Sequence, residues 1–353
     1  MSSYPYPKVS KALVVQKASG DGPYKFDAVL EEKPVSELKS DEVLLKITAV
    51  GFNHKDVWVR KGMYPAITVG SPYGGDGAGI VVASGTSDDT LLNKRVLLNP
   101  SHGWKSDPVG PEAYFSILGS SPTGGTFAEY LVVKREQVIP SPEHLEDIHV
   151  AALPVGAVTA WRATIVNAQI QPGQNVLITG IGGGVALLAL QFCIATGANV
   201  YVTSGTKEKI DRAVGLGAKG GANYKDKDWP AQINDLLQKD KKGSTLDAVI
   251  DSAGGNIFGQ IGRTANPTVT ITMKEVLKNH QFIGSTMGSR KDLEDATAFI
   301  SKHQIVPILS RVIEGGLENA EEGFQLLARG EQFGKVVIRL REAAGGASDQ
   351  SKL

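Results

Sequence analysis

The stretch from Gln171 to Lys209, QPGQNVLITGIGGGVALLALQFCIATGANVYVTSGTKEK, decides the fold. Within it, Asn175 to Thr179 is a short run rich in β-branched residues, which predicts a buried strand. Val185 to Thr196 is long and apolar enough for a buried helix, and Gly197 follows where a C-cap glycine is expected. Val200 to Thr203 is strand-like again. The order of strand, glycine turn, helix and strand predicts the βαβ unit of a dinucleotide-binding domain.

The turn before the predicted helix is crowded with glycines: Gly180, Gly182, Gly183 and Gly184. Glycine lets the backbone approach a pyrophosphate closely, and the helix start at Val185 offers unpaired N–H groups to the anion. The spacing departs from G-x-G-x-x-G, because the third glycine position falls on Val185, but G-x-x-G-x-x-A fits Gly180, Gly183 and Ala186. A flexible loop is the alternative interpretation, and the flanking strand and helix favour the nucleotide site.

Composition limits the class of protein. With 353 residues and 41% hydrophobic content, the chain can form two domains of roughly 150 residues each. The 37 basic and 37 acidic residues balance, which gives no electrostatic reason to expect nucleic acid or a membrane surface as a partner. The single cysteine, Cys193, excludes a disulfide framework and is expected to be a packed core thiol. No run reaches ~18 apolar residues, so we expect a soluble protein inside the cell.

Short apolar or alternating runs separated by turn residues make the first part of the chain strand-like. They are Glu42 to Val50, Gly79 to Ala83, Lys94 to Leu98 and Phe127 to Val133. Asn99 to Gly125 is a long, turn-rich loop, and such loops often cover a site. Its aromatic residues Trp104, Tyr114 and Phe115 are either pocket walls or anchors of the loop.

Helical and strand-like patterns alternate through the rest of the chain. Helices are predicted at Ala151 to Val166, Lys207 to Leu216 and Leu317 to Arg329. Strands are predicted at Ala222 to Tyr224, Asp247 to Ile250, Phe282 to Ser285 and Lys335 to Leu340. Alternation of this kind favours a parallel sheet with covering helices.

Several stretches occur in the order typical of one family: AVGFNHKDVWVRKGMYP, GGDGAG, GTFAEY, AALPVGAVTAW, the βαβ unit, NYKD, DSAGG, GSTMGS and FGKVVIRL. With them the chain resembles the medium-chain dehydrogenase/reductase superfamily, in its zinc-free, quinone oxidoreductase-like branch. The resemblance implies an α/β fold with a GroES-like β-rich catalytic domain and a Rossmann doubly wound parallel-sheet nucleotide-binding domain. The implied boundaries are 1–155 for the first part of the catalytic domain, 156–287 for the Rossmann domain, 288–345 for the return, and 346–353 for a tail.

The resemblance also bears on a metal. Zinc members of the superfamily place a cysteine, a histidine and a second cysteine or aspartate around the ion. This chain has Asn53, Gly75 and Val155 at those positions and so resembles a zinc-type alcohol dehydrogenase-like protein that lacks the zinc ligands. These three cannot serve as zinc ligands, and His54 stands alone beside them. We therefore expect no metal and no Lewis-acid chemistry.

Three residues of the first domain resemble catalytic positions of the family. Asn53 corresponds to an amide near the nicotinamide that can donate to an oxyanion. Tyr64 resembles the proton donor of enoyl-thioester reductases, since a phenol with a pKa of ~10 can protonate an enolate. The alternative is that Tyr64 is a pocket wall and water supplies the proton. Asp56 matches an acidic position of the family, or only holds its loop.

Cofactor choice depends on the end of the second strand of the βαβ unit. An NAD site would place an acidic residue there, but this chain has Ser204, which cannot repel a 2′-phosphate. Lys209 and Tyr224 match family positions that contact that phosphate, so NADPH is the predicted cofactor. The resemblance implies four further cofactor contacts, namely Thr159, Gly284, Ser285 and Lys335.

Between Gly255 and Phe282 the chain is shorter than the family pattern by about fifteen residues, a helix and a strand. Either a rearranged local fold compensates, or the protein is an impaired variant. The end of the chain, Ser351-Lys352-Leu353, is a peroxisomal import signal and predicts recognition by the peroxisomal import receptor. A polar tail on a cytoplasmic enzyme is the alternative.

Together these features predict a zinc-independent, NADPH-dependent reductase of quinones or α,β-unsaturated carbonyls, homodimeric by resemblance. The alternatives are reduction of saturated aldehydes, and a nucleotide-binding protein without turnover.

Overall fold

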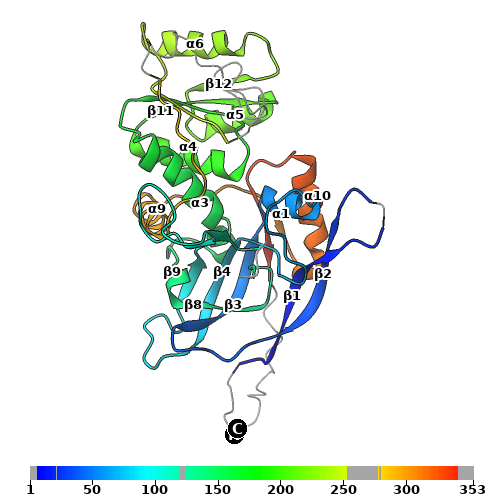
Figure 1. The fold of residues 1–353 in the computed structure, drawn as a ribbon. Helices are drawn as coiled ribbons and strands as arrows, with labels where there is room; N and C mark the ends of the chain where they lie inside the picture. Colours follow the sequence, from blue (N-terminus) through cyan, green and yellow to red (C-terminus); the bar gives the residue numbers. More distant parts are fainter. Residues whose placement is uncertain (1–5, 21, 120–123, 253–276, 278–279, 341–353) are drawn as a thin grey trace, which may run out of the picture. The chain divides into compact units, whose positions relative to one another are not determined.

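The computed structural model describes residues 6–20, 22–119, 124–252, 277 and 280–340 (Figure 1). The chain divides into two compact units. We call residues 1–155 and 289–353 the β-rich unit, and residues 156–288 the α/β unit. The second part of the β-rich unit follows the α/β unit in sequence, so the chain leaves the first unit and returns to it.

A seven-stranded sheet forms the centre of the β-rich unit, with the order β14-β15-β3-β4-β5-β9 and β8 added on β3. Its strands are β3 (Glu42–Gly51), β4 (Asp76–Ser84), β5 (Arg95–Leu98), β8 (Tyr130–Lys134), β9 (Val138–Pro140), β14 (Leu309–Ile313) and β15 (Lys335–Arg339). Residues late in the chain therefore pair with early ones, since Val337 on β15 lies opposite Gly51 on β3. A separate antiparallel pair is formed by β1 (Val9–Lys17) and β2 (Phe26–Pro34).

Helices of the β-rich unit pack through aromatic side chains. Figure 1 shows α1 (His54–Arg60) beside α10 (Ala320–Arg329), and the two helices are in contact. Phe52 lies edge-on to Phe127 and Phe324, with ring centroids 4.8 and 5.1 Å away. Only glycine fits at position 323, because an added Cβ would lie 2.2 Å from the Phe52 ring. The remaining helices are α2 (Asp147–Val150), α9 (Arg290–His303) and the 3-10 helices Arg135–Gln137 and Leu317–Asn319.

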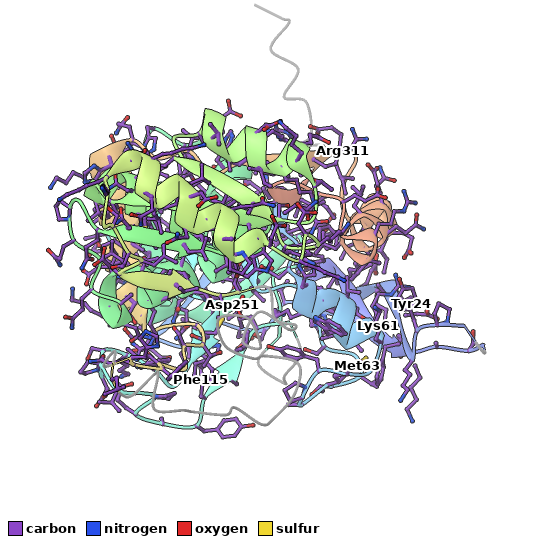
Figure 2. The ribbon with its side chains drawn as sticks, turned by 90° about the horizontal axis from the view of Figure 1, so that it is seen from above. Tyr24, Lys61, Met63, Phe115, Asp251 and Arg311 are labelled. Carbon is purple, nitrogen blue, oxygen red and sulfur yellow. The ribbon has the colours of Figure 1, made fainter. Side chains whose placement is uncertain are left out.

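In the described part of the long loop, the strands are the short pair β6 (Ser101–His102) and β7 (Ser116–Ile117). Trp104 is buried, donates its Nε1–H to the Asp107 carbonyl at 2.8 Å, and packs edge-on against Phe115. Phe115 is labelled in Figure 2. Tyr114 is exposed. Trp104 and Phe115 therefore anchor the loop.

The α/β unit contains a parallel sheet in the order β12-β11-β10-β13, which is half of a doubly wound sheet. Its strands are β10 (Asn175–Ile178), β11 (Asn199–Ser204), β12 (Gly220–Asn223) and β13 (Ala248–Ile250). Its helices are α3 (Pro154–Trp161, from the boundary onward), α4 (Gly184–Thr196), α5 (Lys207–Gly215) and α6 (Trp229–Asp240), with a π-helix at Arg162–Asn167. Cys193 is fully buried on α4, and burial raises the pKa of its thiol to about 12, as expected for a packed core thiol.

One predicted strand is wrong. Phe282 to Ser285 has no regular structure, and Phe282 and Ile283 are 44% and 54% exposed. An apolar run forms a strand only where a neighbour completes its hydrogen bonds, and no described strand pairs with this segment. Most of the shortened segment from Gly255 and the tripeptide Ser351-Lys352-Leu353 lie outside the described residues. Within the described part of the chain, no helix is long and apolar enough to cross a membrane.

Candidate active site

Asn53 and Asp56 form the start of helix α1. The Asp56 carboxylate accepts the Asn53 backbone N–H at 2.8 Å, which satisfies a donor that the helix itself cannot pair. Asp56 is fully buried, and it also accepts a hydrogen bond from the Lys55 ammonium at 3.2 Å. These contacts give Asp56 the role of holding the start of the helix, which was the alternative interpretation of this residue.

The Asn53 side chain is held at both ends by buried charges. Its Nδ2 donates to Asp76 Oδ2 at 2.9 Å, and its Oδ1 accepts from Lys335 Nζ at 2.8 Å. Lys335 Nζ also donates to Asp76 Oδ2, at 2.6 Å, and the Asp76 Oδ1 accepts the Val155 backbone N–H at 2.7 Å. This arrangement fixes the orientation of Asn53. An amide has two N–H groups, and among the described residues only Asp76 accepts one of them, which leaves the other for a ligand.

Lys335 lies in this network rather than at a phosphate. Its ammonium donates to the Phe52 carbonyl, Asn53 and Asp76, at 2.7, 2.8 and 2.6 Å. All three N–H groups are thereby used, and the side chain is only 5% exposed. In the structure Lys335 orients Asn53, and its predicted contact with the cofactor stays a prediction.

Tyr64 follows α1 and packs, half-buried, against the core of the β-rich unit. Lys55 Nζ lies 5.9 Å from the centre of its ring. Burial, and to a lesser degree the Asp56 carboxylate, raises the pKa of the Tyr64 phenol above its usual 10. The phenol therefore keeps its proton at neutral pH, as a proton donor must. Lys61 and Met63, which lie between α1 and Tyr64 in the sequence, are labelled in Figure 2.

The positions that hold zinc ligands in other members do come together. A Cβ on Gly75 would lie 3.2 Å from Val155 Cγ2, and both Asn53 and Val155 bond to Asp76. Asn53 provides an amide, Gly75 only a hydrogen atom and Val155 a methyl group, and this set of groups does not fit zinc. In the residues that the structure describes, no group of three or more His, Cys, Asp or Glu side chains could hold a metal.

In the α/β unit, the glycine turn has the backbone of a nucleotide loop. Gly180 and Gly182 have φ values of +61° and +128°, in the positive range that favours glycine. The turn is tied to the next strand by the Ile181 N–H, which donates to the Thr203 carbonyl at 2.8 Å. Gly183 is the N-cap of α4 and offers no side-chain cap. The first N–H groups of α4, from Gly184 and Val185 onward, are therefore suited to an anion.

Three predicted cofactor residues lie around the carboxyl end of β11. Ser204 is buried and donates to the Ile181 carbonyl at 3.3 Å, close to the glycine turn. Tyr224 follows β12, and a Cβ on the neighbouring Gly205 would lie 2.6 Å from its hydroxyl. Lys209 lies in the first turn of α5, where its backbone N–H donates to the Thr206 side chain. Ligands of parallel α/β sheets bind at this end of the strands.

The other predicted cofactor residues are more scattered. Thr159, on α3, donates its hydroxyl to Met287 Sδ at 3.8 Å. Gly284 and Ser285 lie in the exposed irregular segment described above. Sequence reasoning missed the roles of Asp76 and Lys55. The only local signal for Asp76 was its place in GGDGAG, directly after a glycine pair and at the start of a strand.

Comparison with known proteins agrees with this architecture. The alcohol dehydrogenase GroES-like domain matches residues 39–143, and the zinc-binding dehydrogenase domain matches residues 184–302. A zinc-type alcohol dehydrogenase-like protein, YogA, of Leptosphaeria maculans is 40% identical over 85% of this chain and 91% of its own. A crotonyl-CoA reductase of Streptomyces avermitilis is 27% identical over 92% of this chain and 84% of its own. The crystal structure of an NAD-dependent alcohol dehydrogenase superposes with a TM-score of 0.79 at 30% identity, over 94% of this chain and 100% of that one.

The chain therefore belongs to the zinc-type alcohol dehydrogenase-like family of medium-chain dehydrogenases/reductases. The predicted family and the predicted fold class, a GroES-like domain with a Rossmann domain, are confirmed. The protein is an oxidoreductase that uses a nicotinamide cofactor.

Proposed function

We propose that the protein is a zinc-independent, NADPH-dependent reductase of quinones or α,β-unsaturated carbonyl compounds. The observation that carries the proposal is the amide of Asn53, locked by Lys335 and Asp76 at a position where zinc members have a ligand. A fixed N–H donor costs no reorganisation when charge develops on an oxygen. The Asn53 N–H thereby provides part of the charge stabilisation that a metal ion would give to that oxygen.

The nicotinamide supplies the hydride, and the residues of this chain do the rest. The remaining Asn53 N–H binds the carbonyl oxygen of the acceptor, where negative charge gathers as the β-carbon is reduced. Tyr64 holds a proton at its hydroxyl and gives it to the α-carbon of the enolate. The name of the crotonyl-CoA reductase relative states reduction of an α,β-unsaturated thioester, which supports this acceptor class.

The proposed preference for NADPH rests on residues of this chain alone. The solved relative described above is named an NAD-dependent enzyme and therefore does not support it. β11 ends at Ser204, so the position that carries an acidic residue in NAD sites has no carboxylate to repel a 2′-phosphate. Lys209 and Tyr224 lie beside the same strand end and provide a positive charge and a hydroxyl group. A lysine is a suitable partner for a phosphate.

The test is NADPH oxidation by the purified full chain with quinones, 2-enals, and saturated aldehydes, with and without a chelator. We expect chelator-resistant turnover of quinones or 2-enals and little turnover of saturated aldehydes. Turnover that the chelator abolishes would disprove the metal-free mechanism. Reduction of saturated aldehydes alone would identify a different acceptor class. NADPH binding without turnover of any acceptor would indicate a nucleotide-binding protein.

A further inference from the structure

Lys55 carries a buried ammonium that the proposed reaction does not yet use. Its side chain is 8% exposed, and Nζ donates to the Leu118 carbonyl at 2.6 Å and to Asp56 Oδ1 at 3.2 Å. An ammonium has three N–H groups. Among the described residues there is no third acceptor for it, so one N–H of Lys55 remains for a ligand.

This ammonium lies at the place where the metal ligands of zinc members come together. A Cβ on Gly75 would be only 3.0 Å from Lys55 Cε and 3.2 Å from Val155 Cγ2. The lysine side chain therefore passes through space that a ligand side chain at position 75 would fill. A positive charge is kept at this place although the chain has lost the residues that would hold a metal.

The same charge lies next to the proposed proton donor. Lys55 Nζ is 5.9 Å from the centre of the Tyr64 ring. In the sequence, Lys55 follows Asn53 by two residues. Asn53 is linked to the same place through Asp76, which accepts its amide N–H and follows Gly75 in the chain. Such a set of an amide, an ammonium and a phenol can bind an oxygen that becomes negative and protonate the carbon beside it.

We propose that Lys55 is a further catalytic residue, whose remaining N–H binds the carbonyl oxygen of the acceptor together with Asn53. The inference rests on the proposed function. The acceptor takes a hydride from NADPH at its β-carbon, which breaks the carbon–carbon π bond and moves that electron pair toward the oxygen. Lys55 stabilises this enolate oxygen and keeps its own proton. Tyr64 then protonates the α-carbon, so the acceptor is reduced and NADPH is oxidised to NADP⁺.

The first test compares Lys55→Met, which removes the charge at similar length, with Lys55→Arg, which keeps a charge. We expect Lys55→Met to lower kcat for a 2-enal by about 10²–10³-fold, as for loss of other oxyanion donors, with NADPH affinity unchanged. Lys55→Arg should recover part of the loss. Lys61→Met, at a lysine that stacks on Trp58 at 5.1 Å, is the matched control and should keep full activity.

Gly75→Ala tests the position of the ammonium without removing it, and it serves if Lys55→Met does not fold. The added methyl would press on Lys55 Cε, so kcat should fall while the lysine is still present. Wild-type turnover in both Lys55→Met and Gly75→Ala would overturn the proposal.

A binding measurement separates this proposal from the proposed function. 4-Nitrophenol is the probe, because its phenol and phenolate absorb at different wavelengths and its oxygen mimics that of an enolate. We expect the wild-type protein to lower the pKa of the bound probe and Lys55→Met not to do so. If this difference is found although no acceptor is turned over, the proposed function fails and the oxyanion site at Lys55 remains. Equal titrations with both proteins, including no binding to either, overturn the site.

Discussion

At the scale of single residues, the β-rich unit keeps a buried ion pair beside Asn53. Asp76 is fully buried and Lys335 is 5% exposed, so both charges are withdrawn from bulk solvent. Buried pairs add little net stability compared with apolar residues, but removing one partner is costly. We therefore regard the orientation of Asn53, rather than stability, as what this pair provides.

The Tyr64 phenol is expected to be needed for the reduction of enals but not of quinones. Tyr64→Phe should lower enal reduction by about 10²-fold, in the range of general acid catalysis, and spare quinones, whose product takes protons from water. Burial raises the pKa of Tyr64, so its proton remains bound across pH 6–9. Enal reduction by the wild type should therefore not fall in that range through loss of this proton. The measurement is kcat against pH for both proteins. Unchanged enal turnover in Tyr64→Phe would make Tyr64 a pocket wall.

Lys209 is expected to select the cofactor. Lys209→Glu replaces attraction for the 2′-phosphate by repulsion, so it should weaken NADPH by at least about tenfold, or ~1.4 kcal/mol, and barely affect NADH. The dissociation constants of both cofactors measure this. Lys219→Glu, at the other end of the strands in the same unit, is the control and should change neither. Equal losses for NADPH and NADH in Lys209→Glu would contradict the assignment.

At the scale of elements, the candidate site of each unit lies where secondary structure begins or ends. Asn53 and Asp56 start α1, and the glycine turn joins β10 to α4. These places expose backbone N–H groups that a regular element cannot pair. The chain uses one of them for a carboxylate of its own, Asp56, and leaves the other to a cofactor.

The glycine turn should tolerate no side chain at its most strained position. Gly182→Ala places a side chain at φ +128°, which costs on the order of 1–3 kcal/mol and moves the turn. We expect NADPH affinity to fall by at least tenfold. Gly173→Ala is the matched control, since Gly173 also has a positive φ of +81° and open space around it. It should lower stability but leave NADPH affinity intact, and a similar loss in both variants would show that strain alone is responsible.

At the scale of the whole molecule, the chain builds two units with separate cores. The core of the α/β unit gathers Leu177, Tyr201, Trp229, Ile233 and Leu237. The core of the β-rich unit joins its early and late parts, for example Phe52 with Phe324. Each unit holds one group of candidate residues, the glycine turn in the α/β unit and the polar network around Asn53 in the β-rich unit.

Cofactor binding should stabilise the folded protein by mass action. At a free NADPH concentration of 100 times Kd, the gain is about 2.7 kcal/mol, because the unfolded chain lacks the site. Thermal unfolding at increasing NADPH should show a rising midpoint, with a smaller rise for NADH at the same concentration. A midpoint independent of both cofactors would contradict nucleotide binding by the α/β unit.

The sequence alone determined the elements whose information is local. The βαβ unit follows from the apolar runs and glycines between Gln171 and Lys209, and both Gly180 and Gly182 adopt the positive φ that favours glycine there. The pattern also predicted β3, β15 and α5 within a few residues. It failed at Phe282 to Ser285, because the pattern of a strand says nothing about whether a partner strand is present.

Only the tertiary structure decided how the polar site is assembled. Lys335 bonds to Asp76 and Asn53 from 259 and 282 residues away, because β15 pairs with β3 after the chain returns from the α/β unit. Lys55 gains its place from the missing side chain of Gly75, a contact between residues on different elements. Local patterns carry no record of such contacts, since they depend on which elements pair and on the space left between their side chains. The sequence therefore determined the family and the nucleotide loop, while packing decided which polar groups come together around Asn53.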